Sequence, residues 1–330
     1  MTLGKGPRLG VVGTLVWDTI RRVGRAPIEE WGGIAYALGG VCASLPEAWE
    51  VVPLLKVGRD LEGRAVRFLR GLPRVHFEAI QPVPEPNNRV ELIYADHTRR
   101  TERLSGGVGP WTAPELLPRL SDLDALYVNF ISGFEMTVET AEWLRQAFDG
   151  PIYADLHSLF LAVSAGGLRT PQALPELARW LRCFDAIQMN EAEFALLAEH
   201  SGDPWALAAQ LVGGPLRVLL VTLGERGAAF VAAPDFHPDP LRWPKARRAL
   251  GPTGTALSRR IASTEIVPEP DPTGCGDVWG ATCFARLLAG DALDVAMSRA
   301  NTLAGRNAAL NGATGLHLHL TGRLSSEVHG

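Results

Sequence analysis

The sequence predicts an α/β protein in which a mostly parallel central β-sheet is covered by helices on both faces. Short apolar runs bounded by turn residues alternate with longer segments of helical period along much of the chain. This alternation is typical of strand–helix–strand units, whose strands pair in parallel. With 330 residues, 46% of them hydrophobic and 21% charged, the chain is long and apolar enough to bury one large core.

The expected elements follow one another in order. Strands are predicted at residues 9–12, 125–129, 152–155, 186–189 and 217–222, and helices at residues 34–44, 138–148 and 191–199. Polar residues stand at or just after several strand ends, namely Asp18, Asn129, Asp155, Asn190 and Thr222. Each alone is more often a cap or a turn former. Because ligands bind beyond the carboxyl ends of parallel strands, together they predict a binding site at that edge.

Two segments fit this main sheet poorly and predict a small accessory sheet. Residues 18–23 and 89–103 alternate polar and apolar side chains, with a turn near Asp96-His97, as solvent-flanked antiparallel strands do. We expect a single domain over residues 1–330, with lid segments at about 16–33 and 87–106. Exposed strand edges invite pairing, so the lid is also a candidate homodimer interface. Residues 233–258, rich in Pro, Gly and Arg, predict a long surface loop of unassigned role.

Charge and cysteine content exclude several classes of function. A formal net charge of −4 argues against a nucleic acid or an anionic membrane as the main partner, since such binding relies on clustered Lys and Arg. No run approaches the ~18 apolar residues of a membrane-spanning helix, and no apolar signal region follows residues 1–7, so we expect a cytoplasmic protein. The four cysteines form no C-x-x-C pair, which predicts neither a zinc site nor a disulfide framework.

The most informative motif is D-P-T-G-C-G-D at residues 271–277, which leads into an apolar helical run. Glycines let the backbone approach a ligand closely, and the N–H groups at a helix N-terminus suit a phosphoryl group. We therefore expect the N–H groups of Gly274, Cys275 and Gly276 to form an anion hole, with Asp277 accepting a proton from an attacking hydroxyl. For the motif alone, a strand-to-helix turn whose aspartate stabilises the helix dipole is an equally good interpretation.

Four further motifs accompany this one, and their order is informative. The chain carries G-G at 32–33, K-V-G-R-D-L-E-G at 56–63, N-E-A-E at 190–193 and T-L-G-E-R-G-A at 222–228. From about Gly10 to Leu316, the five motifs together resemble, in family order, those of the PfkB (ribokinase-like) family of carbohydrate and nucleoside kinases. The resemblance implies a ribokinase-like fold with a β-sheet lid. It also implies an ATP-dependent phosphotransferase that acts on a primary alcohol of a sugar, sugar acid or nucleoside.

The resemblance also assigns roles to individual residues. It implies Asp277 as general base, and ATP, Mg²⁺ and a monovalent cation such as K⁺ as cofactors. It places the nucleotide at Thr222, Gly224, Gly227 and Asn301, the acceptor at Asp18, Gly32 and Gly33, and the monovalent cation at Asp271 and Thr273. Asp155, which ends a predicted strand at the same edge, is a further candidate acceptor residue.

Asn190 and Glu193 stand three residues apart on an expected helix start. At this spacing their oxygens can face a hydrated Mg²⁺ that bridges phosphates. The same pair is equally typical of a helix N-cap with a capping glutamate. The resemblance favours the metal site.

Several residues depart from the family pattern or have two interpretations. Ala37 replaces an asparagine that contacts sugar hydroxyls in many relatives, which weakens a ribokinase assignment. Trp17 and Trp31 in the lid region, and Trp111, are candidates to stack on the acceptor, although core packing is the commoner use of a tryptophan. His157, two residues past Asp155, is a candidate to point into the same cleft, although a single histidine is more often structural.

Cys275 replaces the alanine usual in the signature, and two interpretations stay open for its thiol. At a helix N-terminus the dipole favours a reactive thiolate if the side chain is exposed. A buried cysteine instead packs as a small inert hydrophobe.

Other functions also fit parts of the pattern. A kinase of a non-sugar alcohol, such as a pyrimidine or vitamin, is compatible with the apolar residues around Ala37. A catalytically silent sugar or nucleotide sensor on the same fold is the alternative of a different class. A Rossmann dehydrogenase is disfavoured because no G-x-G-x-x-G follows the first strand.

Overall fold

An eight-stranded β-sheet forms the centre of the computed structural model, which describes residues 6–77, 79–94, 100–197, 202–244, 254–264, 267 and 270–324. The six strands from β14 to β4 run parallel, and β15 and β16 are antiparallel to their neighbours. This confirms the mostly parallel sheet that the sequence predicts. The spatial order is β16 (Leu257–Ile261), β15 (Ala228–Ala232), β14 (Val218–Thr222), β13 (Ala186–Asn190), β10 (Ile152–Asp155), β9 (Ala125–Asn129), β1 (Arg8–Val12) and β4 (Glu50–Leu54).

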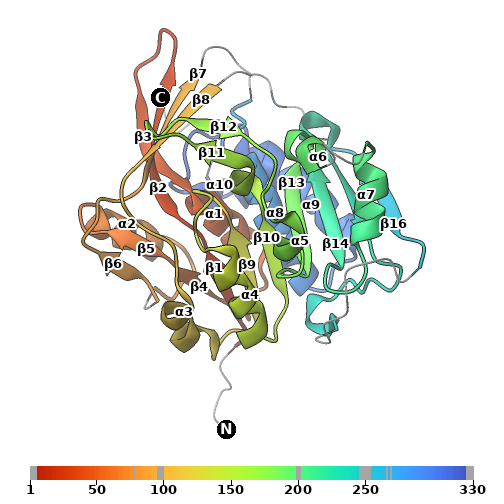
Figure 1. Cartoon of the computed structure of the whole chain (residues 1–330). Coiled ribbons are helices and arrows are strands. Elements are labelled where there is room, and N and C mark those ends of the chain that lie inside the picture. Colours follow the sequence, from red (N-terminus) through yellow and green to blue (C-terminus); the bar gives the residue numbers. More distant parts are fainter. Residues whose placement is uncertain are drawn as a thin grey trace.

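Helices cover both faces of this sheet, as the sequence predicts (Figure 1). Apolar side chains fill the space between helices and sheet in two clusters, one on each face. Tyr127 and Val128, successive residues of β9, belong to different clusters, because side chains alternate between the faces of a strand. One face carries α3 (Ala113–Leu120), α4 (Val138–Ala147), α5 (Leu177–Trp180), α6 (Glu191–Leu197) and α7 (Pro204–Leu211), and the other carries α1 (Ile34–Ser44), α2 (Glu62–Arg70), α8 (Cys275–Leu288), α9 (Leu293–Asn307) and α10 (Leu316–Leu320).

A second, four-stranded sheet lies beyond one end of the central sheet (Figure 1). We call it the small sheet; its order is β3 (Ile28–Gly33), β2 (Leu15–Arg22), β7 (Arg89–Tyr94) and β8 (Arg100–Ser105). The outer pairs are antiparallel, as predicted, but β2 and β7 pair in parallel. The turn predicted at Asp96-His97 lies outside the described residues. A further short pair, β5 (Lys56–Gly58) and β6 (Gln81–Val83), flanks the central sheet.

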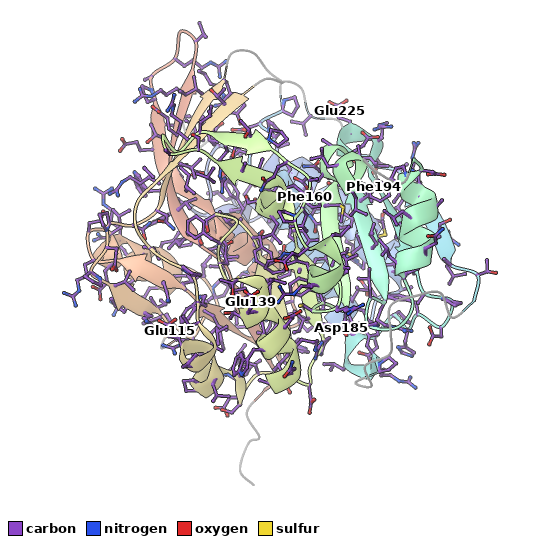
Figure 2. All side chains as sticks on the ribbon, in the orientation of Figure 1. Glu115, Glu139, Phe160, Asp185, Phe194 and Glu225 are labelled. Carbon is purple, nitrogen blue, oxygen red and sulfur yellow. The ribbon has the colours of Figure 1, made fainter. Side chains whose placement is uncertain are left out.

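The carboxyl ends of the parallel strands point toward the small sheet. Asp185, just before β13, lies at the opposite end of the molecule, whereas Glu225, just after β14, lies at the near end (Figure 2). The predicted loop at 233–258 begins after β15, which runs antiparallel, and so leaves the sheet at the far end. Its Trp243 is buried against the core, and its last two residues belong to β16. Residues 233–244, the described first part of this segment, therefore start from the end of the sheet opposite the edge where a ligand is expected.

The described part of the chain holds no helix that combines the length and the apolar character needed to cross a membrane.

Candidate active site

The first turn of α8 meets the carboxyl ends of two central strands. Asn129, at the end of β9, donates a hydrogen bond from Nδ2 to Asp277 Oδ1 at 2.7 Å. Gln188 of β13 donates from Nε2 to the Gly276 carbonyl at 3.0 Å. The structure thus brings the predicted base to the edge that the strand-end residues define.

The backbone at this turn partly fits the predicted anion hole. Gly274 is the N-cap of α8 and has a φ of 73°, a left-handed conformation that favours glycine. The Cys275 N–H donates to the Pro272 carbonyl at 3.2 Å, so it belongs to the turn itself. Gly276 is exposed and stands in the first helical turn, whose N–H groups have no intrahelical acceptor. Gly274 and Gly276 are therefore the better candidate donors.

A buried polar network lies beneath Asp277. Tyr153 donates from its hydroxyl to Gln188 Oε1 at 2.9 Å, and Gln188 Nε2 donates to Asp155 Oδ2 at 3.1 Å. Burial, with a contribution from the Asp277 carboxylate, raises the pKa of Asp155 to about 8. Asp155 therefore lies under the site as a mostly protonated group at pH 7. Sequence reasoning missed Gln188, although a glutamine inside an apolar strand run was a usable signal.

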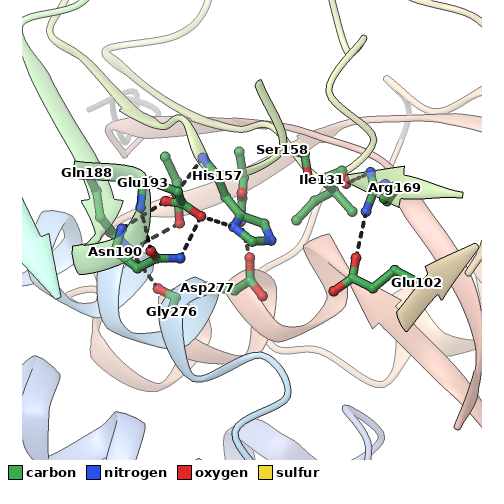
Figure 3. A network of polar contacts seen from close by, with 12 residues as sticks. Glu102, Ile131, His157, Ser158, Arg169, Gln188, Asn190, Glu193, Gly276 and Asp277 are labelled. Carbon is green, nitrogen blue, oxygen red and sulfur yellow. Dashed lines mark hydrogen bonds and ion pairs between the residues drawn. The ribbon is translucent and has the colours of Figure 1, made fainter. Parts of the chain in front are cut away.

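Asn190 and Glu193 form the reciprocal pair of a helix cap (Figure 3). The Glu193 N–H donates to Asn190 Oδ1 at 3.0 Å, and the Asn190 N–H donates to Glu193 Oε2 at 2.8 Å. Glu193 Oε1 also accepts from Asn190 Nδ2 at 2.6 Å and lies 2.5 Å from His157 Nδ1. The capping interpretation is thus confirmed. These oxygens are already engaged by protein donors.

His157 lies at the same edge of the central sheet as Asp155, as its position in the sequence predicts. Burial lowers the pKa of the imidazole, but the Glu193 carboxylate outweighs it and, with Asp155 and Glu102, raises that pKa to about 9. His157 is therefore a cation at neutral pH, held against Glu193.

This raised pKa gives a prediction for the pH dependence of stability. The stabilisation from His157 is fully present below its unfolded pKa of about 6.5 and is lost as the pH rises through about 9. We expect the melting temperature of the wild type to fall between pH 7 and pH 10 more steeply than that of His157→Gln, in scanning fluorimetry.

His317→Gln is the matched control. Burial lowers the pKa of His317, so this residue is neutral over that whole range and its replacement should leave the slope unchanged. Parallel curves for the wild type and His157→Gln would contradict the assignment.

The face of the small sheet that carries Asp18 is mainly apolar, with Val16, Ile20, Val90 and Leu92 near this carboxylate. Asp18 and Glu30 are directly opposite each other on β2 and β3. Asp18 is buried, and a Cβ built on Gly32 would lie 1.7 Å from Asp18 Oδ2. Only glycine therefore leaves room for this carboxylate. The structure places the predicted acceptor residues Asp18, Gly32 and Gly33 together.

The tryptophans of the small sheet lie on its other face, where the packing interpretation fits them. Trp17 packs edge-on against Trp31, with ring centroids 5.0 Å apart. The Arg64 guanidinium of α2 lies 5.0 Å from the Trp17 ring, and Phe68 of α2 lies against Trp31. Neighbouring residues of a strand point to opposite faces. Because Asp18 faces the site, Trp17 faces away from it.

Two other residues that the sequence singles out, Trp111 and Ala37, also lie in packed regions. Trp111 is buried between the Lys56 and Arg119 side chains, each 5.1 Å from its ring centroid. Ala37 is fully buried in α1 within the main core. Neither residue is therefore positioned to choose an acceptor.

The small sheet is joined to the body of the protein beside the site (Figure 3). Glu102 of β8 forms an ion pair with Arg169 at 3.3 Å, and Arg169 donates to the Ile131 carbonyl at 2.5 Å. On the other side, Arg22 pairs with Asp271 at 2.7 Å, and the Tyr94 hydroxyl lies 2.9 Å from Thr273 Oγ1.

The residues expected to bind a nucleotide differ in how open their surroundings are. Thr222 ends β14, and Gly224 lies in open space just beyond it. Gly227 is packed against the end of β16. Asn301 is buried in α9, where Oδ1 accepts from Trp279 Nε1 at 2.7 Å and Nδ2 donates to two backbone carbonyls at 3.2 Å each. These contacts account for Asn301 without a nucleotide base.

The Cys275 thiol points toward the turn and α9, where it donates to the Asp271 and Ala304 carbonyls at 3.6 and 3.4 Å. Burial raises the pKa of the thiol to about 11, while a hydrogen bond from Asn307 Nδ2 at 3.4 Å opposes that rise. The packing interpretation fits this thiol, and only its backbone shapes the turn.

Comparisons with known proteins identify the fold. No protein-family model matches the chain, and no curated protein matches its sequence. A pyrophosphate-dependent kinase in the ribokinase family matches with a TM-score of 0.68 and 15% identity, over 93% of this chain and 97% of that one. A Burkholderia thailandensis nucleoside kinase in complex with inosine matches with a TM-score of 0.65 and 16% identity, over 96% and 97%. An E. coli ribokinase II protein in complex with ATP and Mg²⁺ matches with 0.66 and 17%, over 96% and 99%.

Proposed function

We propose that this chain, which has the ribokinase-like fold, transfers a phosphoryl group from ATP to a primary alcohol of a sugar or nucleoside. The observation that carries this proposal is the position of Asp277. It stands in the first turn of α8, is held by Asn129 at 2.7 Å and lies beside exposed Gly276. A carboxylate beside a helix N-terminus can take the proton of an attacking hydroxyl while the backbone N–H groups receive the transferred phosphoryl oxygens.

The small sheet supplies the proposed acceptor contacts. Two carboxylates directly opposite each other on neighbouring strands are unfavourable unless donors lie between or beside them. Asp18 and Glu30 make such a pair, and Thr314 Oγ1 donates to Glu30 at 2.8 Å. A hydroxyl of the acceptor can donate a hydrogen bond to a carboxylate at the position of Asp18. A neutral polyhydroxyl compound fits this face better than a sugar acid does.

Magnesium fits this site through its water shell. Among the residues that the structure describes, no three or more His, Cys, Asp or Glu side chains gather to hold a metal. Glu193 and Asn190 already cap α6, so they would contact the waters of a Mg²⁺ that the donor phosphates bind directly. The ion would neutralise phosphate charge during transfer.

Glu193→Gln should raise the Mg²⁺ concentration needed for the half-maximal rate by about 10–100-fold. Glutamine keeps the capping geometry but removes the charge, because either residue can fill this capping position. The Michaelis constant for the acceptor should change little.

Glu115→Gln is the matched control, because Glu115 occupies the same capping-box position on α3. An unchanged Mg²⁺ titration in Glu193→Gln would leave that residue with its capping role alone.

A panel of donors and acceptors tests the proposed function directly. The full-length protein would be incubated with Mg²⁺ and either ATP or pyrophosphate, and with sugars, sugar acids, nucleosides and pyrimidine or vitamin alcohols. We expect ATP-dependent product from a neutral sugar or nucleoside, and none from Asp277→Asn. Product formed with pyrophosphate but not with ATP would show that pyrophosphate is the phosphoryl donor. Product formed only from a non-sugar alcohol would show that the acceptor is such an alcohol instead of a sugar or nucleoside. Ligand binding without turnover on any pair would indicate a sensor.

Dimerisation through the small sheet stays a prediction. Within the described residues β3 is an edge strand of that sheet, and such edges invite pairing. Light scattering on the wild type tests it.

A further inference from the structure

The carboxylate of Asp271 lies at the turn that precedes α8, and both of its oxygens accept hydrogen bonds. Oδ1 accepts from the Thr273 N–H at 3.0 Å and from Thr273 Oγ1 at 2.6 Å. Oδ2 accepts from the Arg22 guanidinium at 2.7 Å. The Asp271 side chain is only 10% exposed. A carboxylate so far from water needs a positive partner, and Arg22 supplies it.

Arg22 reaches this turn from the small sheet. It is the last residue of β2, and its guanidinium lies 5.1 Å from the centroid of the Tyr94 ring. Tyr94 in turn contacts Thr273 Oγ1 at 2.9 Å. From α9, Asn307 Nδ2 donates to the Thr273 carbonyl at 2.9 Å. The turn is therefore fastened from the small sheet on one side and from α9 on the other.

A monovalent cation does not fit at Asp271 in this arrangement. Cations such as K⁺ are bound by oxygen atoms, whereas a guanidinium offers only N–H donors and stays protonated at any working pH. Arg22 lies at hydrogen-bond distance from Oδ2, and a second positive charge beside it would be repelled. Oδ1 is held by Thr273. The residues present thus disagree with the cation that the sequence resemblance implies.

We propose that Arg22 takes the place of the monovalent cation, as a positive charge tethered to the small sheet. It neutralises Asp271 and holds the turn that positions Gly274 and the start of α8. Because the charge comes from β2, it is in place only when the small sheet lies against the turn. The strand that carries Asp18 is therefore linked directly to the backbone that receives the phosphoryl group. This consequence for catalysis rests on the proposed function, whereas the replacement of the cation does not.

A K⁺ titration of the rate tests the proposal. Ionic strength would be held constant with tetramethylammonium chloride, which is too large to enter the turn. The wild-type rate should be flat in K⁺. Arg22→Gln should lower the rate by about 10–100-fold, the usual effect of losing a residue that orients a site, and K⁺ should restore much of it. Arg22→Lys, which keeps the charge, should retain more activity.

Arg21→Gln is the matched control. Arg21 is adjacent in sequence, lies on the other face of the small sheet and pairs with Glu91 at a half-exposed position. Its replacement should change neither the rate nor the response to K⁺. A wild type that K⁺ activates, or an Arg22→Gln variant that behaves like Arg21→Gln, would overturn the proposal.

Thermal melting gives a second readout that needs no activity. Removing one partner of a buried ion pair is destabilising, so Arg22→Gln should melt roughly 5–10 °C below the wild type in tetramethylammonium chloride. K⁺ should raise the melting temperature of this variant and leave that of the wild type unchanged. If this pattern appears in a protein without kinase activity, the proposed function fails and the assignment of Arg22 stands. K⁺-specific stabilisation of the wild type would refute it.

Discussion

Asp277→Asn is expected to lower the turnover rate by roughly 10²–10⁴-fold, the usual scale for loss of a general base. The asparagine is nearly isosteric, and its side-chain oxygen can still accept the hydrogen bond that Asn129 donates at 2.7 Å. Folding and donor binding should therefore survive, and the loss should appear in kcat. Steady-state kinetics on the acceptor that proves active, with donor affinity measured by calorimetry, would separate the two.

The competing interpretation of Asp277 is that it only stabilises the dipole of α8. Asp294 offers a matched control, because it also stands in the first turn of a helix, α9, and it pairs with Arg259 at an exposed position. Asp294→Asn should cost a few tenths of a kcal/mol in stability and leave kcat unchanged. Near-wild-type turnover in Asp277→Asn would remove Asp277 from the mechanism.

The central sheet was predictable because its signal is local. Each buried parallel strand is a short apolar run, and the polar residues that end these runs must gather at one edge once the strands pair in parallel. Asn129 and Asp277 are 148 residues apart in sequence, yet both come from motifs that define that edge. The edge was predictable for this reason, although their hydrogen bond was not.

The sequence did not allow us to predict which face of the small sheet meets the site. Alternation indicates that Trp17 and Asp18 point to opposite sides, but it does not say which side meets the site. The contacts of α2 decide it, because Arg64 and Phe68 pack against the two tryptophans.

Asn190 and Asn301 show the difference between local and distant partners in single residues. The cap that Asn190 forms with Glu193 is local, so the sequence already contained it. The partners of Asn301 are Trp279, 22 residues away, and the backbone carbonyls of Ile261 and Ala262 at the end of β16, 40 and 39 residues away. No local sequence pattern indicates these contacts. Likewise, nothing near Asp271 in sequence indicates Arg22, because the two are 249 residues apart.

Gly274→Ala is expected to destabilise the protein by about 2–5 kcal/mol and to abolish activity with it. A Cβ at this position would lie 2.2 Å from Cγ of Tyr36, a side chain only 2% exposed, which has little room to move. The φ of 73° adds about 1–2 kcal/mol for any residue with a Cβ. Overpacking against the buried ring adds about 1–3 kcal/mol more. Urea unfolding followed by circular dichroism measures the sum.

Gly276→Ala separates the backbone's structural role from its proposed role at the phosphates. Gly276 is exposed, and the nearest atom to a Cβ built there is Gln188 Nε2 at 3.9 Å, so alanine should leave stability nearly unchanged. If the backbone N–H groups of this turn receive phosphoryl oxygens, the added methyl group stands where the donor must approach, and the Michaelis constant for the donor should rise about 10-fold or more. Tyr36→Ala should relieve part of the Gly274→Ala defect in stability, since it removes the clashing ring, and should not help Gly276→Ala. A Gly276→Ala variant with wild-type donor kinetics would show that the phosphates do not approach the backbone there.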